Sequence, residues 1–243
     1  MSNRPETPAG REEVSMADER WYCMRTGARP AAENMAVDEA LLTSSSKTGR
    51  PILRFYGWSE PAASFGYFQH YDAVAKTTPL RPLVRRPTGG GIVPHDNDWT
   101  YSLIFPPCHA WYALKAIESY RTLHRWVQSA FSHCGLSSEL AQVAQKSTAG
   151  QCFAGPERLD VVMQGRKIAG AAQRRSRDGL LIQGSVQPPD NAQRGDWEKA
   201  MLAVAIEEWQ VKWEDVDLPE MVVCQAKALA TEKYTRREYN ERR

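Results

Sequence analysis

Apolar residues recur along much of the chain at the spacing of an α-helix. The clearest case is the segment from residue 112 to residue 134, where one apolar stripe is followed by Gly135, a residue that commonly ends helices. The stripe consists of Leu114, Ile117, Leu123, Trp126, Val127, Ala130 and Phe131. A first helix is predicted over residues 31–42, and two further helices are predicted near residues 196–209 and 219–231.

Shorter runs of alternating or wholly apolar residues predict the strands. Separated by turns rich in glycine and proline, these runs cover residues 51–58, 61–68, 81–87 and 99–105. Residues 159–175 predict a hairpin turned at Gln164-Gly165, and Asp178-Gly179 marks another turn before the next strand. Because the strands come as hairpins with helices between them, we expect an α+β fold with a mixed, largely antiparallel sheet flanked by helices. A doubly wound parallel sheet is disfavoured.

Length and composition favour a single domain. The 243 residues, 42% of them hydrophobic, suffice for a large core, and we expect a flexible lead over residues 1–20 followed by one domain over residues 21–243. A formal net charge of +2 gives no support for nucleic-acid or membrane-surface binding. Five scattered cysteines without metal-like spacing indicate reduced thiols, and no apolar run has the length of a membrane span. A cytoplasmic protein without a metal site is therefore expected.

The sequence RRPTGGGIVPHD, residues 85–96, places three consecutive glycines between a pair of arginines and a histidine. A glycine run loses much backbone entropy on folding, so it indicates left-handed dihedrals or a close approach that a β-carbon would block. The run matches neither the GxxxxGK[ST] phosphate loop nor the GxGxxG dinucleotide fingerprint. With Arg85, Arg86 and His95 beside it, the turn could hold a carboxylate, a phosphate or an acyl chain, or it could be only a tight turn.

Two further residues are candidates for chemistry. Lys167, in GRKIAGAAQ, stands among small apolar residues on a predicted strand, where desolvation strengthens the effect of its charge on an oxyanion or a thiolate. Most strand lysines simply point to solvent. Cys152 is flanked by glycine turns and is suited to be an accessible nucleophile, although any one of five cysteines is seldom catalytic. His95 would more often orient a loop than act as a base.

Four motifs that occur in a fixed order give this sequence a family resemblance. ENMAVDEALL, RFYGW, RRPTGGGIVPHD and KIAGAAQ together resemble the lipoate-protein ligase and octanoyltransferase family over residues 21–243. Cys152-Phe153, shortly before the lysine strand, is similar to the cysteine-type octanoyltransferases. The resemblance implies a fold like the catalytic domain of biotin and lipoate protein ligases, with an acyl-binding tunnel. Residues 21–243 would then be one acyltransferase or ligase catalytic domain.

The resemblance also implies roles for individual residues. Cys152 would carry the acyl group as a thioester, and Lys167 would face the acyl carbonyl and stabilise the thiolate and the oxyanion. The acyl chain would lie along the glycines, in a pocket built from Arg54, Arg86, Thr88, Gly89, Gly90, Gly91, His95 and Gly170. The expected donor is octanoyl acyl carrier protein. The expected acceptor is a lysine of a lipoyl domain or of a glycine-cleavage H-type protein, and no cofactor is expected.

Two positions depart from the family pattern. Asp98 stands where the family usually has a glycine, and Gln183 precedes Gly184 where many members have histidine. A first alternative function is a ligase that activates free lipoate or octanoate with ATP and magnesium, in which Lys167 would hold the carboxylate and the α-phosphate. A second alternative is a non-catalytic acyl-binding or regulatory protein that has lost turnover, for which the two departures leave room.

Overall fold

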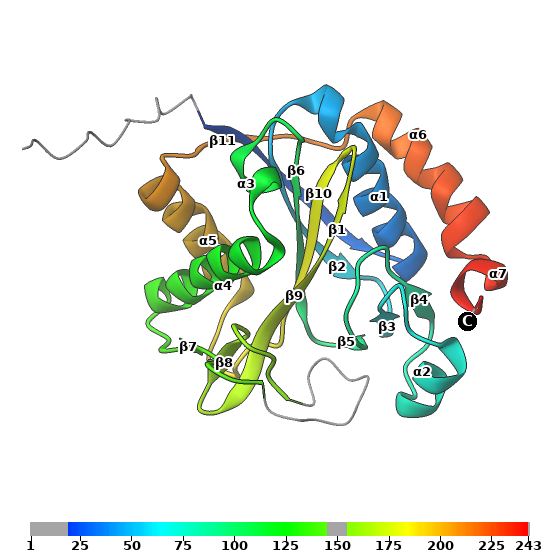
Figure 1. Cartoon of the computed structure of the whole chain (residues 1–243), viewed down its shortest axis with the longest axis horizontal. Coiled ribbons are helices and arrows are strands. Elements are labelled where there is room, and N and C mark those ends of the chain that lie inside the picture. The colour runs from blue at the N-terminus through cyan, green and yellow to red at the C-terminus, as the bar shows by residue number, and fades with distance from the viewer. Residues whose placement is uncertain (1–18, 145–154, 243) are drawn as a thin grey trace, which may run out of the picture.

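A large sheet divides the molecule into two layers of helices (Figure 1). The computed structural model describes residues 19–144 and 155–242. Within them the large sheet has eight strands in the order β11 (Lys212–Asp215), β1 (Arg20–Arg29), β2 (Ile52–Trp58), β6 (Trp99–Phe105), β10 (Gly179–Val186), β9 (Arg166–Ser176), β8 (Val161–Met163) and β7 (Glu139–Leu140). A smaller sheet has the order β4 (Leu83–Arg85), β3 (Ala62–Phe65) and β5 (Val93–His95).

Helices cover both faces of the large sheet. One face packs against α4 (Ala116–His133) and α5 (Arg194–Trp209), and the other packs against α1 (Ala31–Thr48) and α6 (Glu220–Leu229). The remaining helical segments are α2 (Tyr71–Thr77), α3 (Ala110–Ala113), the π-helical turn η1 (Ala230–Tyr234) and α7 (Arg237–Asn240). None of the helices in the described part of the chain has the length and apolar character that a bilayer crossing requires.

The large sheet contains both parallel and antiparallel pairs, which confirms the expected α+β class with a mixed sheet. β1 pairs in parallel with β2 and with β11, because α1 carries the chain back across the sheet between β1 and β2. From β2 through β6, β10, β9, β8 and β7 every pair is antiparallel. The sequence pattern did not predict β1, since a register shift between Arg25 and Ala28 interrupts the alternation of buried and exposed residues.

The two faces of the large sheet have cores of different composition. On the side of α4 and α5, aromatic rings gather around Trp21, which stacks on Trp209 at 6.2 Å and meets Phe105 edge to face at 5.3 Å. On the side of α1 and α6, the core is built mainly of aliphatic side chains and methionines. Helix α1 also buries Asn34 and Asp38 completely. A polar layer therefore lies inside the second core.

Helix α4 begins at Ala116, later than the predicted start at residue 112. Leu114 has an extended backbone after the short helix α3, and the Glu118 carboxylate accepts a hydrogen bond from the Lys115 backbone N–H at 2.9 Å. This cap fixes the start of α4. The expected apolar stripe is correct from Leu123 onwards, whereas Ile117 is 47% exposed.

The C-terminal segment closes over the small sheet. The Asn240 side chain accepts a hydrogen bond from the Arg85 backbone N–H at 2.8 Å, and the Arg85 guanidinium donates to the backbone carbonyls of Tyr239 and Asn240. The same guanidinium donates to the carbonyls of Tyr67 and Gln69. Arg85, at the start of the glycine motif, thus joins the C-terminus to the loops around the candidate site.

Candidate functional site

Lys167 is buried because β9 carries a bulge. Residues 167 and 169 of β9 pair with the consecutive residues 162 and 161 of β8, so Ile168 is the extra residue. The bulge turns Lys167 and Gly170 to the same side of the strand, where regular alternation would place them on opposite sides. A β-carbon at Gly170 would lie 2.7 Å from Cε and 2.8 Å from Nζ of Lys167. Gly170 therefore provides the space in which the lysine side chain lies.

A buried carboxylate, which the sequence analysis missed, holds Lys167. Lys167 Nζ lies 2.7 Å from Asp160 Oδ2, and both side chains are buried. The Tyr120 hydroxyl donates to Asp160 Oδ1 at 2.5 Å, and the Glu157 backbone N–H donates to Oδ2 at 2.7 Å. Asp160 is thereby fixed on two sides. In the sequence, Asp160 is marked only by its position directly before β8, the first strand of the hairpin whose second strand carries Lys167.

Five of the predicted site residues meet around one cavity. The cavity has a volume of about 50 Å³, and the predicted residues that line it are Arg86, Gly90, His95, Lys167 and Gly170. Its other lining residues include Met35, Tyr56, Trp58, Ser64, Gln183 and Ser185. Lys167 and the glycine run therefore share one small cavity.

The glycine run approaches another glycine closely. A β-carbon at Gly66, just after β3, would overlap the carbonyl oxygen of Gly90, whereas one at Gly89 would meet no atom within 4 Å. Gly90 has a left-handed φ of 86°, and Arg86 Nη2 donates to the Gly89 carbonyl at 2.5 Å. The close backbone approach that the motif predicted is therefore between Gly90 and Gly66. Whether Gly89, Gly90 and Gly91 also contact an acyl chain stays a prediction.

Arg54 is placed behind the cavity wall. Its side chain is fully buried and donates to Asp38 Oδ1 at 2.7 Å, to Asn34 Oδ1 at 2.8 Å and to Thr26 Oγ1 at 2.9 Å. The guanidinium lies 3.9 Å from the ring centre of Tyr56, which does line the cavity. Arg54 thus joins α1 to β1 and supports Tyr56, a structural role that the sequence analysis did not foresee.

Gln183, one of the two departures from the family pattern, completes the buried polar layer. Its amide nitrogen donates to Asp38 Oδ2 at 2.8 Å, and its amide oxygen accepts from Thr88 Oγ1 at 2.7 Å. The Tyr56 hydroxyl donates to the same Asp38 oxygen at 3.1 Å. Gln183 lines the cavity, and Thr88 is therefore connected to the cavity through its hydrogen bond with Gln183.

Asp98, the other departure, holds His95. The distance between His95 Nδ1 and Asp98 Oδ2 is 2.9 Å, and His95 Nε2 lies 2.8 Å from Ser64 Oγ. The imidazole stacks on the Trp58 ring with 3.7 Å between ring centres. His95 is accordingly fixed in position and in orientation, and its second nitrogen faces a hydroxyl group.

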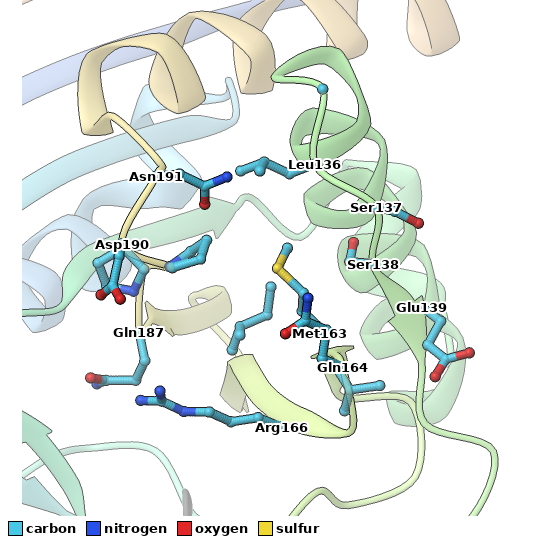
Figure 2. A pocket seen from close by; sticks show the side chains of 15 residues that line it. Leu136, Ser137, Ser138, Glu139, Met163, Gln164, Arg166, Gln187, Asp190 and Asn191 are labelled. Carbon is cyan, nitrogen blue, oxygen red and sulfur yellow. The ribbon is translucent and has the colours of Figure 1, made fainter.

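A larger hollow lies elsewhere on the molecule. This groove of about 800 Å³ runs between the end of α4 and the turn of the β8–β9 hairpin, and Figure 2 shows Met163, Gln164 and Arg166 on one side with Asp190 and Asn191 across from them. None of the predicted site residues that the structure describes lines the groove. Its size alone gives no reason to move the candidate site away from Lys167.

The predicted nucleophile Cys152 lies outside the described residues, because residues 145–154 belong to the part of the chain that the structure leaves undescribed. Its role therefore stays a prediction. The described thiols are of two kinds: Cys108 and Cys224 are exposed, while Cys23 is buried and Cys134 is half-buried. Burial raises the pKa of the Cys23 thiol to about 11, which makes Cys23 a poor nucleophile at neutral pH.

The chain has clear relatives among proteins of known activity. Residues 30–187 match the model of the lipoyl protein ligase A/B catalytic domain. Octanoyltransferase LipM from Geobacillus kaustophilus is 36% identical over 185 residues, and its counterpart from Bacillus subtilis is 36% identical over 186 residues. Each match covers 70% of this chain but 66% of the relative, slightly less than two thirds of the relative's length.

Solved structures share the fold at lower sequence identity. Protein Ta0514 of T. acidophilum with bound lipoic acid superposes with a TM-score of 0.74 at 21% identity, covering 93% of this chain and 100% of that one. A lipoate-protein ligase A bound with ATP gives a TM-score of 0.73 at 21% identity, covering 93% of this chain and 99% of that one. At these identities the similarity shows the fold and leaves the substrate open.

Proposed function

The chain belongs to the lipoyl protein ligase A/B catalytic domain family, and we propose that it transfers an octanoyl group from acyl carrier protein to a lysine of a lipoyl-carrying protein. The acyl group would pass through a thioester on Cys152. The donor is already an activated thioester and the product is a more stable amide, so the reaction requires no nucleotide or metal. A lipoyl domain or a glycine-cleavage H-type protein is the proposed acceptor.

The observation that carries this proposal is the set of relatives named octanoyltransferase LipM, at 34–36% identity over 68–70% of the chain. The likeness to ATP-bound and lipoate-bound ligases is confined to the fold, so it does not favour a ligase reaction over acyl transfer. The bipartite lipoate protein ligase of Thermoplasma acidophilum has been solved as a system with its E2 lipoyl domain, which is the acceptor class proposed here.

The position of Lys167 supports the proposed chemistry. The Cys152 thiolate would attack the donor carbonyl and release the carrier thiol, after which the acceptor amine would attack the new thioester and release the Cys152 thiol. Each step forms a tetrahedral oxyanion, and a buried ammonium at the cavity stabilises such a charge.

The test is an intact-mass measurement of the protein mixed with octanoyl acyl carrier protein in the absence of nucleotide. We expect one octanoyl adduct, removable by hydroxylamine, which a lipoyl acceptor discharges with formation of an octanoyl-lysine. Cys152→Ala should show neither adduct nor transfer. Cys108→Ala is the matched control, because Cys108 is an exposed thiol elsewhere in the sequence. Octanoyl transfer that strictly requires ATP and free octanoate would replace this proposal with the ligase reaction.

A further inference from the structure

The side chains of Ser64, His95 and Asp98 form a continuous chain of hydrogen bonds beside the cavity. Ser64 Oγ lies 2.8 Å from His95 Nε2, and His95 Nδ1 lies 2.9 Å from Asp98 Oδ2. All three residues are buried, with exposed fractions of 2%, 5% and 8%. Ser64 and His95 both line the cavity that Lys167 lines. The distances are those of a serine nucleophile, its base and the carboxylate that orients the base.

The hydrogen bonds determine which atom carries each proton. Asp98 Oδ2 accepts from Thr100 Oγ1 at 2.9 Å and from Ser185 Oγ at 2.7 Å in addition to His95. Since Oδ2 is the acceptor in both of these bonds, a neutral His95 ring donates to it from Nδ1. His95 Nε2 is then an acceptor, and the Ser64 hydroxyl donates to it. This is the tautomer in which imidazole can remove the serine proton.

The surrounding structure holds this arrangement rigidly. Ser64 is on β3 and His95 is on the neighbouring antiparallel strand β5. The His95 ring stacks on Trp58, and the Trp58 indole N–H donates to Thr100 Oγ1 at 2.7 Å. Thr100 in turn donates to Asp98. The imidazole therefore cannot turn away from Ser64 without breaking contacts on its face and at Nδ1.

Cationic groups stand where negative charge would develop. Arg86 Nη1 lies 3.4 Å from Ser64 Oγ, and both Arg86 and Lys167 line the cavity into which Ser64 faces. A carbonyl carbon bonded to Ser64 Oγ would carry its oxyanion in this cavity, close to the guanidinium. Preorganised cations at such a position stabilise a tetrahedral intermediate more than they stabilise the starting ester.

We propose that Ser64, His95 and Asp98 form a second acyl-accepting centre, which hydrolyses medium-chain acyl esters and thioesters independently of Cys152. The medium-chain acyl class rests on the proposed function, whereas the serine centre rests on the geometry alone. Ser64 and His95 are the catalytic residues of this centre, and Asp98 is a positioning residue.

The reaction balances without any co-reactant other than water. Ser64 Oγ bonds to the acyl carbonyl carbon while its proton moves to His95 Nε2. The bond to the leaving alkoxide or thiolate then breaks, and that group takes the proton from Nε2. A water molecule attacks the acyl-serine, His95 accepts the water proton and returns it to Ser64 Oγ, and the free carboxylic acid leaves.

The test uses the full chain with Cys152→Ala, so that no thioester can form at that residue. We expect an octyl fluorophosphonate to add once, at Ser64, with loss of fluoride, as seen by intact mass and peptide mapping. p-Nitrophenyl octanoate should be hydrolysed by the same protein. Ser64→Ala should remove both signals. Ser119→Ala is the matched control, because Ser119 is a fully buried serine on α4 outside the cavity.

The variant Asp98→Asn tests the charge of Asp98 separately from its effect on folding, because asparagine has nearly the same shape as aspartate. The neutral amide no longer stabilises the imidazolium that forms when His95 takes the serine proton, so labelling should slow by about 10³- to 10⁴-fold in a folded protein. Absence of an adduct on Ser64 in the Cys152→Ala protein would overturn the proposal, and so would undiminished labelling in folded Asp98→Asn. Octanoyl transfer by wild type without Ser64 labelling would refute only this inference, and labelling without transfer would refute only the proposed function.

Discussion

Lys167 and Asp160 function as a unit at the scale of single residues. Each is the buried counter-ion of the other at 2.7 Å, so removing one leaves an uncompensated charge in the interior. The effect of a lysine substitution on activity must therefore be separated from its effect on folding. The pair allows this separation, because both charges can be removed together.

Lys167→Met should lower the rate of octanoyl transfer by roughly 10²- to 10³-fold, since the cation at the developing oxyanion is lost. The same change should cost about 3–5 kcal/mol of unfolding free energy, because Asp160 remains buried without its counter-ion. Adding Asp160→Asn should restore part of the stability and none of the activity. Single-turnover kinetics and urea unfolding measure the two effects. Wild-type rates in folded Lys167→Met would show that Lys167 is not part of the chemistry.

Gly170→Ala should reduce transfer by displacing the lysine. The added methyl group would lie 2.7 Å from Lys167 Cε, too close for the side chain to keep its position. Gly57→Ala is the matched control on another strand of the same sheet, since its methyl group would find its nearest neighbour at 3.6 Å. We expect a clear fall in kcat for Gly170→Ala with a small change in Tm, and little change in either for Gly57→Ala. Equal kinetics for the two variants would contradict the proposed fit between Gly170 and Lys167.

At the scale of elements, His124 gives α4 a dependence on pH. Burial lowers the pKa of the His124 imidazole from 6.5 to about 4, and its Nδ1 lies 2.7 Å from the Leu159 carbonyl oxygen, next to Asp160. The unfolded chain therefore binds a proton more readily than the folded chain between these two pH values. The contribution of His124 to the free energy of unfolding is fully present above pH 6.5. It is lost as the pH falls towards 4, and the total loss is about 3 kcal/mol.

The pH effect can be measured by urea unfolding between pH 7.5 and pH 4.5 on wild type and on His124→Gln. We expect wild type to lose more stability on acidification than the variant, because the variant has no group to protonate at this position. His133→Gln, which changes a half-exposed histidine at the end of the same helix, should retain the wild-type dependence. Parallel pH profiles for wild type and His124→Gln would contradict the assignment.

Gly66, just after β3, packs so closely against the glycine run of residues 89–91 that we expect no side chain to fit at this position. A methyl group there would overlap the Gly90 carbonyl, so Gly66→Ala should shift the loop and cost about 1–3 kcal/mol of stability. Gly89→Ala should have a much smaller effect on stability, since its methyl group would meet no atom within 4 Å. Thermal unfolding of the two variants compares them directly. Equal losses would mean that the loop does not depend on this contact.

At the scale of the whole molecule, the C-terminus and the candidate site are coupled through Arg85. Asn240→Ala removes the acceptor of the Arg85 backbone N–H, and leaving that buried donor unpaired should cost about 1–3 kcal/mol. Glu241→Ala changes the next residue, whose partner Arg237 is on the surface, and should leave stability nearly unchanged. Urea unfolding measures both. A stable Asn240→Ala variant would show that the C-terminal segment does not hold β4.

The sequence by itself determined most of the longer elements and the family, because both depend on neighbouring residues. The stripe from Leu123 to Phe131 indicated α4, and Gln164-Gly165 indicated a two-residue turn, where both residues have the left-handed φ that such a turn needs. Local motifs likewise identified the lipoyl ligase and octanoyltransferase family. Lys167, Arg86 and His95 were found because they lie within those motifs, and they line one cavity.

Only the tertiary structure decided which partners these residues have. Asp160 reaches Lys167 through a bulge that no composition pattern reports, and Ser64 reaches His95 because β3 pairs with a strand about thirty residues later. Arg54 is turned away from the cavity because Asp38 lies beneath it on α1. Pairing of buried charges and hydroxyls depends on sheet order and register, which are set by the packing of the whole chain and are not encoded in any short segment.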